Sequence, residues 1–222
     1  MPACTGVRLV LRVVDLGVSI GRVQIVRNAA IDLREGEICG LIGRNGAGKT
    51  TLLRALMGAV PATGKAELGH IDLLALPAHR RVGLGIGYMP EDRRLVPEFT
   101  VEQNICLPTW TTAVDDAEHR LAWIFSIMPE VAGFRSRRAV ELSGGQQKMV
   151  ALARALMAGR RMLLLDEPFE GLAPALALRL GEVMSALKEE GLSILVAESN
   201  EVHISKMISR AFRIERGTVS AN

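Results

Sequence analysis

The stretch 43–50, GRNGAGKT, constrains the fold of this 222-residue chain more than any other feature. It matches the pattern G-x-x-x-x-G-K-[ST] and follows the apolar run 37–43, which is typical of a strand buried on both faces. A helical pattern begins at about Lys49 and ends at Gly58. A strand, a glycine-rich loop and a helix in this order predict a phosphate cradle at the helix N-terminus.

The residue types in this loop each have an expected role in binding a nucleotide. Gly46 and Gly48 allow backbone N–H groups to close around phosphates, and Lys49 offers a point charge to the β and γ phosphates. The Thr50 hydroxyl is expected to ligate Mg²⁺, so ATP and Mg²⁺ are the predicted ligands. The predicted nucleotide contacts in the loop are Gly43, Arg44, Asn45, Gly46, Ala47, Gly48, Lys49, Thr50 and Thr51.

A second motif supplies two acids. Residues 161–168, RMLLLDEP, have the pattern of a buried strand that ends in Asp166 and Glu167. Asp166 can hold Mg²⁺ through water, and Glu167 can accept a proton from an attacking water. Alone, the two acids could equally be the start of a helix. Paired with the loop, they predict a hydrolytic site in which Glu167 and Lys49 are catalytic.

A third motif, LSGGQQ at 142–147, adds another helix start. Ser143, Gly144 and Gly145 are typical of a capped helix N-terminus, which would make a second phosphate-binding position in the same chain. One active site does not need two such cradles. The motif therefore indicates that a second chain takes part.

The remaining pattern alternates strands and helices. Alternation of apolar and polar residues from about 8 to 34 predicts short antiparallel strands, and the segment from about 100 to 138 has a helical pattern. A strand at 192–198 is expected to lead into a short helix with His203 on its surface. Strands alternating with helices predict an α/β fold with a mostly parallel sheet.

Composition excludes several classes. The net charge of +3 is too small to indicate nucleic-acid binding, and no window approaches eighteen uninterrupted apolar residues, as a membrane span would require. Cys4, Cys39 and Cys106 are far apart and are interpreted as free thiols in a reducing compartment. These features favour a cytosolic location.

Taken together, the motifs GRNGAGKTT, ELSGGQQKMVALARALM and LLLDEP resemble the ATP-binding subunit of ABC transporters, in family order across the whole chain. The resemblance implies a P-loop NTPase (RecA-like) core with an N-terminal antiparallel β subdomain and an inserted helical lobe at about 98–140, all in a single domain, 1–222. It also implies ATP-dependent dimerisation, in which each chain caps the nucleotide of the other. The capping residues implied are Ser143, Gly144, Gly145 and Gln146.

Two further stretches, YMPEDRRLVPEFTVEQNI and DEPFEGLAP, are similar to the ATPase subunits of branched-chain or hydrophobic amino acid importers and their urea and amide relatives. This similarity implies ATP hydrolysis that drives a separate integral membrane permease. It implies a second ATPase chain, identical or different, and a peripheral position on the inner face of the cell membrane. No nucleic-acid partner is expected.

Several positions depart from the pattern of the wider family. Ile20 stands where an aromatic residue usually stacks on adenine, and Glu91 stands where a glutamine usually contacts Mg²⁺ and water, although a carboxylate remains a competent ligand. Ala173 replaces an aspartate, and Glu170 replaces a small residue. Ser199 replaces a histidine that reaches the terminal phosphate. With Ser199 and Glu91 still counted as catalytic, we expect an active but slow ATPase.

Two alternatives stay open from the sequence. The departures fit a nucleotide-dependent binding or regulatory subunit, with slow or absent hydrolysis, that works in a heterodimer. A soluble ABC protein of translation or DNA repair is the other class, although such proteins usually carry two ATPase domains or long coiled insertions. Phosphate release and nucleic-acid binding, respectively, discriminate these alternatives from a transport ATPase.

Overall fold

The computed structural model describes residues 8–112 and 116–221, so residues 1–7, 113–115 and 222, with Cys4, lie outside the described part. Strands β1 (Leu9–Ile20) and β2 (Val23–Arg34) form a long antiparallel pair, which β4 (Thr63–Leu68) and β5 (Ile71–Asp72) extend. The short strands predicted from 8 to 34 are thus two long ones. The pairing of β1 and β2 contains register shifts, which interrupt the simple alternation in the sequence.

The parallel part of the sheet carries the predicted motifs at its strand ends. It consists of β3 (Ile38–Ile42), β6 (Ile86–Met89), β7 (Met162–Asp166), β8 (Ser193–Glu198) and β9 (Arg210–Glu215), with β10 (Thr218–Ala221) antiparallel to β9. Among the described residues the strands form one sheet in the order β5-β4-β1-β2-β10-β9-β3-β8-β7-β6. The predicted α/β fold with a mostly parallel core and an N-terminal antiparallel subdomain is confirmed.

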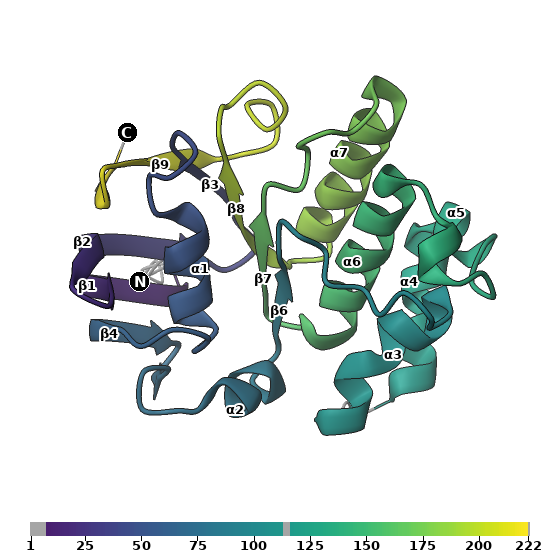
Figure 1. Ribbon diagram of the computed structural model, residues 1–222, viewed down its shortest axis with the longest axis horizontal. Helices are drawn as coiled ribbons and strands as arrows, with labels where there is room; N and C mark the ends of the chain where they lie inside the picture. Colours follow the sequence, from purple (N-terminus) through teal and green to yellow (C-terminus); the bar gives the residue numbers. More distant parts are fainter. Residues whose placement is uncertain (1–7, 113–115, 222) are drawn as a thin grey trace, which may run out of the picture.

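Helices cover both faces of the parallel strands (Figure 1). Alternate residues of β7 point to opposite layers: Met162 and Leu164 join the core on the side of α1 (Lys49–Leu56), while Leu163 and Leu165 join the core on the other side. Helices α6 (Gly144–Ala158) and α7 (Pro174–Glu189) form that second layer. Since each β7 side chain is buried, the strand reads as a continuous apolar run.

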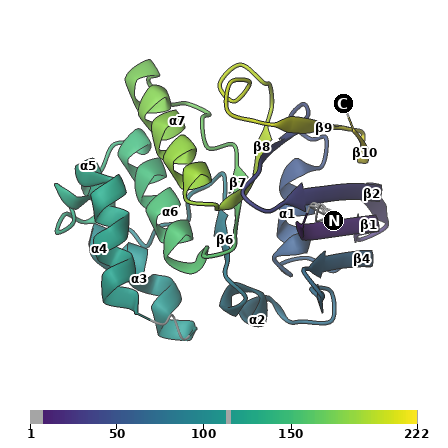
Figure 2. The ribbon, with the colours of Figure 1, turned by 180° about the vertical axis from the view of Figure 1, so that it is seen from behind.

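The helical segment expected between 100 and 138 is present as α3 (Val101–Thr111), α4 (Ala117–Ile127) and α5 (Pro129–Ala132), followed by the 3₁₀ turn Ala139–Glu141. These helices stand together at the end of the molecule away from β1 and β2, and the view from behind shows the same separation (Figure 2). They pack mainly on α6, which lies between them and the sheet. In the described part of the chain, no helix is long and apolar enough to cross a membrane.

The prediction of a short helix after residue 198 is wrong. Residues 199–208 form turns, in which the Ser205 amide donates to the Glu201 carbonyl and the Ile208 amide donates to the Ile204 carbonyl. A segment of this length is too short to be a stable helix by itself, and buried Ile204 fixes it against the core instead. His203 lies in these turns and stacks on Phe169, with 5.6 Å between ring centroids. Helix α2 (Ala78–Gly83) and strand β10 were not predicted from the sequence.

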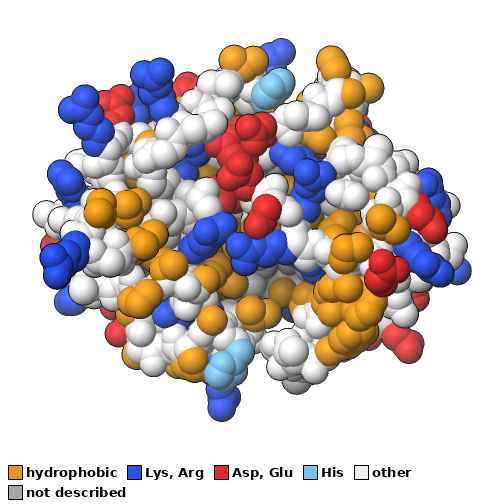
Figure 3. Space-filling view, viewed as in Figure 1, with side chains coloured by type: hydrophobic (Ala, Val, Ile, Leu, Met, Phe, Trp, Pro, Cys, Tyr) orange, Lys and Arg blue, Asp and Glu red, His pale blue; other side chains and the backbone are white. Residues whose placement is uncertain are grey.

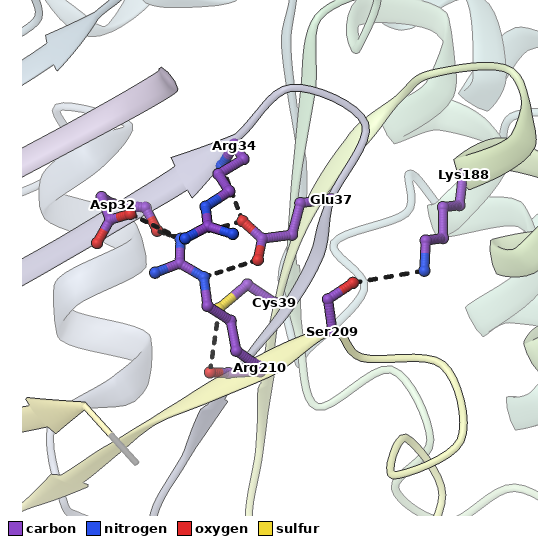
Figure 4. Close-up of polar contacts among 8 residues, drawn as sticks. Asp32, Arg34, Glu37, Cys39, Lys188, Ser209 and Arg210 are labelled. Atoms are coloured by element: carbon purple, nitrogen blue, oxygen red, sulfur yellow. Dashed lines mark hydrogen bonds and ion pairs between the residues drawn. The ribbon is translucent and has the colours of Figure 1, made fainter. Parts of the chain in front are cut away.

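A charged cluster joins three strands at the N-terminal end of β3 (Figure 4). The Arg210 guanidinium on β9 donates to Glu37 Oε1 at 2.7 Å and to Asp32 Oδ2 at 2.7 Å. Glu37, which precedes β3, also accepts from the Arg34 backbone amide, and its side chain is buried. Each carboxylate in this cluster therefore has a donor, so the cluster links the three strands and leaves no carboxylate charge unpaired.

Candidate nucleotide site

The glycine-rich loop connects the C-terminal end of β3 to the N-terminus of α1. Gly46 has φ 80° and Gly48 has φ 112°, backbone conformations that L side chains rarely adopt. A Cβ atom at Gly43 would lie 2.3 Å from the Ile214 carbonyl oxygen, so β9 closes against the loop only because that residue is glycine. The chain therefore builds the anion cradle that the motif predicts.

Lys49 lies buried inside this loop. Its Nζ donates to the Gly43 carbonyl at 2.5 Å and to the Arg44 carbonyl at 3.3 Å. The same Nζ is 2.9 Å from Glu167 Oε1, and both side chains are only 5% exposed. The loop lysine and the second acid of β7, far apart in the sequence, thus meet directly.

The first acid of β7 faces the start of α1. The Thr50 hydroxyl donates to Asp166 Oδ1 at 3.1 Å, and the Tyr88 hydroxyl on β6 donates to Asp166 Oδ2 at 3.4 Å. Burial raises the pKa of Asp166 to about 6, the Thr50 hydrogen bond opposes that shift, and the nearby charges of Glu91 and Glu167 add to it. Oxygen atoms of this kind, gathered with excess negative charge, are the ligands that a hard divalent cation prefers.

Glu167 has an unusual backbone and an unmet acceptor. Its φ is 48°, in the left-handed region, and its amide donates to the Ala197 carbonyl of β8 at 2.9 Å. Oε2 accepts from the Ser199 amide at 3.1 Å. Oε1 is buried and has no hydrogen-bond partner in the described chain, because its contact with Lys49 Nζ is an ion pair that lacks hydrogen-bond geometry. An acceptor held in this way can take a proton from a water molecule.

Glu198, a residue that the sequence did not point to, lies behind Glu167. It is buried and accepts from the Phe169 amide at 3.0 Å. Burial, and then hydrogen bonding with the neighbouring Glu167 carboxyl group, raise the pKa of Glu198 to about 8. Two acids in contact in the interior cannot both ionise freely. Only the pattern of a strand ending in Glu could have suggested this residue, and nothing local identifies its partner.

Two cavities flank the loop. The smaller, of about 370 Å³, is lined by Ile25 together with Asn45, Gly46, Gly48, Lys49, Thr50, Thr51, Glu91 and Glu167. The larger, of about 860 Å³, is lined on the loop side by Gly43, Arg44, Asn45, Gly46 and Ala47, and on the other side by Ser199 and residues of β9 and β10. The structure thus brings the loop, both β7 acids, Glu91 and Ser199 to one edge of the sheet. Figure 3 shows acidic side chains gathered near the middle of one face, with Lys and Arg side chains beside them.

Two groups of predicted residues lie apart from these cavities. Ile20, at the end of β1, is 54% exposed and lines neither cavity, whereas Ile25 on β2 does line the smaller one. Ser143 caps α6: its hydroxyl accepts from the Gln146 amide, and its own amide donates to Gln146 Oε1. Neither cavity includes the α6 start, with Ser143, Gly144, Gly145 and Gln146, among its described lining residues.

The loop after Glu167 carries the two remaining positions at which the sequence departs from the family pattern. Glu170 is exposed, and Ala173 stands at the N-cap of α7, where it makes no side-chain capping bond. Gly145 of α6 packs closely on the start of α7 and on this loop, since a Cβ there would lie 2.4 Å from Leu176 Cδ2 and 3.5 Å from Leu172 Cδ2. The α6 start and the loop after Glu167 therefore form one packed surface.

The sequence has clear relatives. A family model described as ABC transporter matches residues 26–170. The chain is 34% identical, over 90% of its length and 86% of the relative's, to the high-affinity branched-chain amino acid transport ATP-binding protein BraG of Pseudomonas aeruginosa. It is 31% identical, over 90% of its length and 84% of the relative's, to the lipopolysaccharide export system ATP-binding protein LptB of Escherichia coli.

Solved structures share the fold. One, described as the ADP conformation of MJ1267, an ATP-binding cassette of an ABC transporter, has a TM-score of 0.81 and 25% identity, over 96% of this chain and 90% of that chain. Another, described as a dimeric structure of the bacterial ABC transporter cassette MJ0796, has a TM-score of 0.83 and 23% identity, over 95% of this chain and 96% of that chain.

Proposed function

Because this chain belongs to the ABC transporter family of ATP-binding proteins, and is therefore an ATPase, we propose that it powers an importer for branched-chain amino acids or a related small solute. The identity to BraG supports this choice of solute. LptB, named for lipopolysaccharide export, is also a relative, so family membership alone does not select the solute. Residues 1–222 act as one ABC ATPase domain in this proposal, with the helical lobe at about 98–140.

Each residue of the site has a role in the proposal. The phosphates of ATP occupy the loop of residues 43–51, where Lys49 exchanges its carbonyl and Glu167 contacts for phosphate oxygens. Thr50, Asp166 and Glu91 would hold Mg²⁺, which neutralises charge developing on the phosphates. Ser199 offers a hydroxyl to the terminal phosphate. Ile20, which is exposed and lines neither cavity, would give the adenine an apolar surface, an arrangement weaker than stacking on an aromatic ring.

Glu167 is the proposed general base. Departure of Lys49 toward the phosphates frees Oε1, which then accepts the proton of the attacking water. The Ser199 amide keeps Oε2 in place, so the carboxylate presents one defined oxygen to that water. The single observation that carries this assignment is the buried Oε1, which is ion-paired with Lys49 and accepts no hydrogen bond from the described residues.

Dimerisation completes the proposed site. The α6 start, with Ser143, Gly144, Gly145 and Gln146, lies outside both cavities, so in this proposal it caps the nucleotide of a second ATPase chain head to tail. ATP would close the two chains, and hydrolysis would reopen them. Integral membrane permease subunits would receive this motion through the helical lobe and hold the ATPase at the inner face of the membrane.

Trapping of ATP tests the proposal. Glu167→Gln should bind Mg-ATP without hydrolysing it, and sedimentation velocity should then show a dimer that dissociates when ATP is removed. Lys49→Met is the control, because it lacks the charge that binds the phosphates, and it should remain monomeric. A Glu167→Gln chain that binds ATP and never dimerises, alone or with a second ATPase chain from the same transporter, would contradict the mechanism.

Turnover discriminates the transport ATPase from a regulatory subunit. Wild-type phosphate release should exceed that of Lys49→Met, and a branched-chain amino acid with its binding protein should stimulate it in proteoliposomes that hold the permeases. Phosphate release equal to that of Lys49→Met, with normal ATP binding, would favour the regulatory alternative. Stimulation by lipopolysaccharide in place of the amino acid would overturn the choice of solute.

A further inference from the structure

Lys148, near the N-terminus of α6, is a buried lysine that none of the three sequence motifs explains. Its side chain is 7% exposed, and burial lowers the pKa of its amine below the ordinary value for lysine. Its Nζ donates to the Glu167 carbonyl at 2.6 Å and also donates to the Glu170 carbonyl. A charge taken from water needs such partners, and here both belong to a single turn.

That turn is the one that carries the proposed base. The Glu170 amide donates to the Glu167 carbonyl, so residues 167–170 form a tight turn, and Lys148 binds the carbonyl oxygens at its two ends. Glu167 has φ 48° although it is not glycine. A residue in that conformation costs free energy, and it persists only where the surrounding structure holds it.

The described contacts hold Glu167 from three elements: β8 with the residue after it, α6, and α1, whose Lys49 is ion-paired with Oε1. The Ala197 carbonyl on β8 accepts from the Glu167 amide, and the amide of Ser199, the residue after β8, donates to the Glu167 carboxylate. Lys148, from α6, donates to its carbonyl, which also accepts from the Glu170 amide. Removal of the amine would take the Lys148 donor from both carbonyls and leave the Glu167 carbonyl with the longer bond from the Glu170 amide, so the turn would be freer to relax from its strained geometry.

We propose that Lys148 is a positioning residue for Glu167, holding the 167–170 turn so that Glu167 Oε1 faces the nucleotide cavity. This inference rests on the proposed role of Glu167 as the general base. It also links the two functions of α6, since Lys148 lies little more than one helical turn from the Ser143 cap. A shift of the α6 start against a partner chain would reach the base of the same chain through this amine.

Arg120 on α4 provides a matched control. Its guanidinium also donates to two backbone carbonyls, those of Leu156 and Gly159, at the opposite end of α6. Arg120→Met therefore removes a partly buried cation and two carbonyl contacts from the same helix, away from the nucleotide cavities. A general loss of packing would affect both variants alike.

The test compares Lys148→Met with Arg120→Met in two measurements. In the nucleotide-free chain, hydrogen exchange of a peptide covering residues 165–172 should become at least about tenfold faster in Lys148→Met and stay unchanged in Arg120→Met. With Mg-ATP, kcat should fall by about tenfold to 100-fold in Lys148→Met, with nucleotide affinity within about threefold of wild type. Lys148→Arg, which keeps a cation and its donors, should recover part of the loss.

The Glu167→Gln background separates positioning from stability. If Lys148 acts through the base, Lys148→Met should have no further effect on the residual turnover of Glu167→Gln. Unchanged exchange at 165–172, or an equal loss of kcat in both backgrounds, would overturn the proposal. A wild-type chain without turnover, combined with faster exchange in Lys148→Met, would contradict the proposed function and leave the positioning role intact. If Lys148→Met does not fold, Lys148→Gln and the same exchange measurement decide the question.

Discussion

The two ends of strand β3 carry charged clusters of opposite character. At the N-terminal end, Arg210 binds Glu37 and Asp32 by short hydrogen bonds, and each carboxylate has a donor. At the C-terminal end, Glu167 Oε1 has no hydrogen-bond partner in the described chain, and the pKa values of Asp166 and Glu198 are raised, first of all by burial. One cluster gives each carboxylate a hydrogen-bond donor, whereas the other gathers Asp166, Glu167 and Glu198 around a single Lys49 ion pair and leaves Glu167 Oε1 without a hydrogen bond from the described residues.

The difference between the two clusters separates residues that hold the fold from residues that are available for chemistry. The donors of a fully partnered buried carboxylate offset the cost of its desolvation in the free energy of the folded state, and they leave no acceptor to offer a ligand. A buried carboxylate with missing partners raises that free energy, and a cation, a phosphate-bound lysine or a water molecule can relieve it. The glycine-rich loop lies at the unsatisfied end. Substitutions at the N-terminal end of β3 should therefore change mainly stability, and substitutions at its C-terminal end should change mainly nucleotide binding and turnover.

The largest expected effect is on nucleotide binding. Lys49→Met removes the buried charge at the loop, so affinity for a fluorescent ATP analogue should fall by about 100-fold or more, the loss of more than one charge-assisted hydrogen bond. Lys188→Met, which removes a partly exposed lysine near the other end of the sheet, is the control and should bind normally. Equal ATP affinity in the two variants would contradict the claim that nucleotide binds at the Lys49 end of β3.

The next effect is on stability at the satisfied end. Arg210→Met leaves Glu37 buried without its cation, so the free energy of unfolding should fall by roughly 2–3 kcal/mol, below the value for a fully buried pair because Arg210 is partly exposed. Denaturant unfolding measures this, with Arg8→Met, at an exposed ion pair, as the control. Turnover per folded molecule should not change. A loss of turnover at constant stability would assign Arg210 a role that its place in the fold does not predict.

Glu198 should make stability depend on pH. Its pKa is raised from 4.5 to about 8 in the folded chain, so between these values the folded state holds a proton that the unfolded state has lost. Unfolding free energy should therefore decrease as pH rises through this window, by at most about 2 kcal/mol between pH 6 and pH 8. Glu198→Gln should remove that decrease, and Glu215→Gln, at an exposed position, is the control. Parallel pH curves for wild type and Glu198→Gln would show that Glu198 is ionised in the folded state throughout.

The smallest expected effect is a gain. Ser199→His would place an imidazole at the edge of the larger cavity, where it can donate to the terminal phosphate. Turnover should rise by about tenfold, less than a preorganised donor contributes, because the surrounding turn is shaped for serine. Ser205→His, exposed in the same segment, should leave turnover unchanged. Unaltered turnover in Ser199→His would mean that the serine does not limit the rate.

The sequence predicted those parts of the fold that depend on local pattern. The apolar runs of β3 and β7, the glycine-rich loop and the Ser143 cap need few distant contacts to specify them. The helix predicted from the local pattern of residues 199–208 is absent, because burial of Ile204 against the core outweighs that pattern. Lys148 and Glu198 could not be identified, since their significance comes from partners 19 and 31 residues away (167 − 148 and 198 − 167) that only the packed structure brings together.

The same substitution at the two ends of β3 tests the account most directly. Steady-state phosphate release with Mg-ATP should be compared for Glu167→Gln and Glu37→Gln at a temperature where both chains are folded. We predict that the rate of phosphate release falls by about 100-fold or more in Glu167→Gln, as expected for loss of a general base. In Glu37→Gln, the rate per folded molecule should equal that of the wild type. Wild-type turnover in Glu167→Gln, or an equal fall in both variants, would contradict the assignment of the unsatisfied end as the catalytic one.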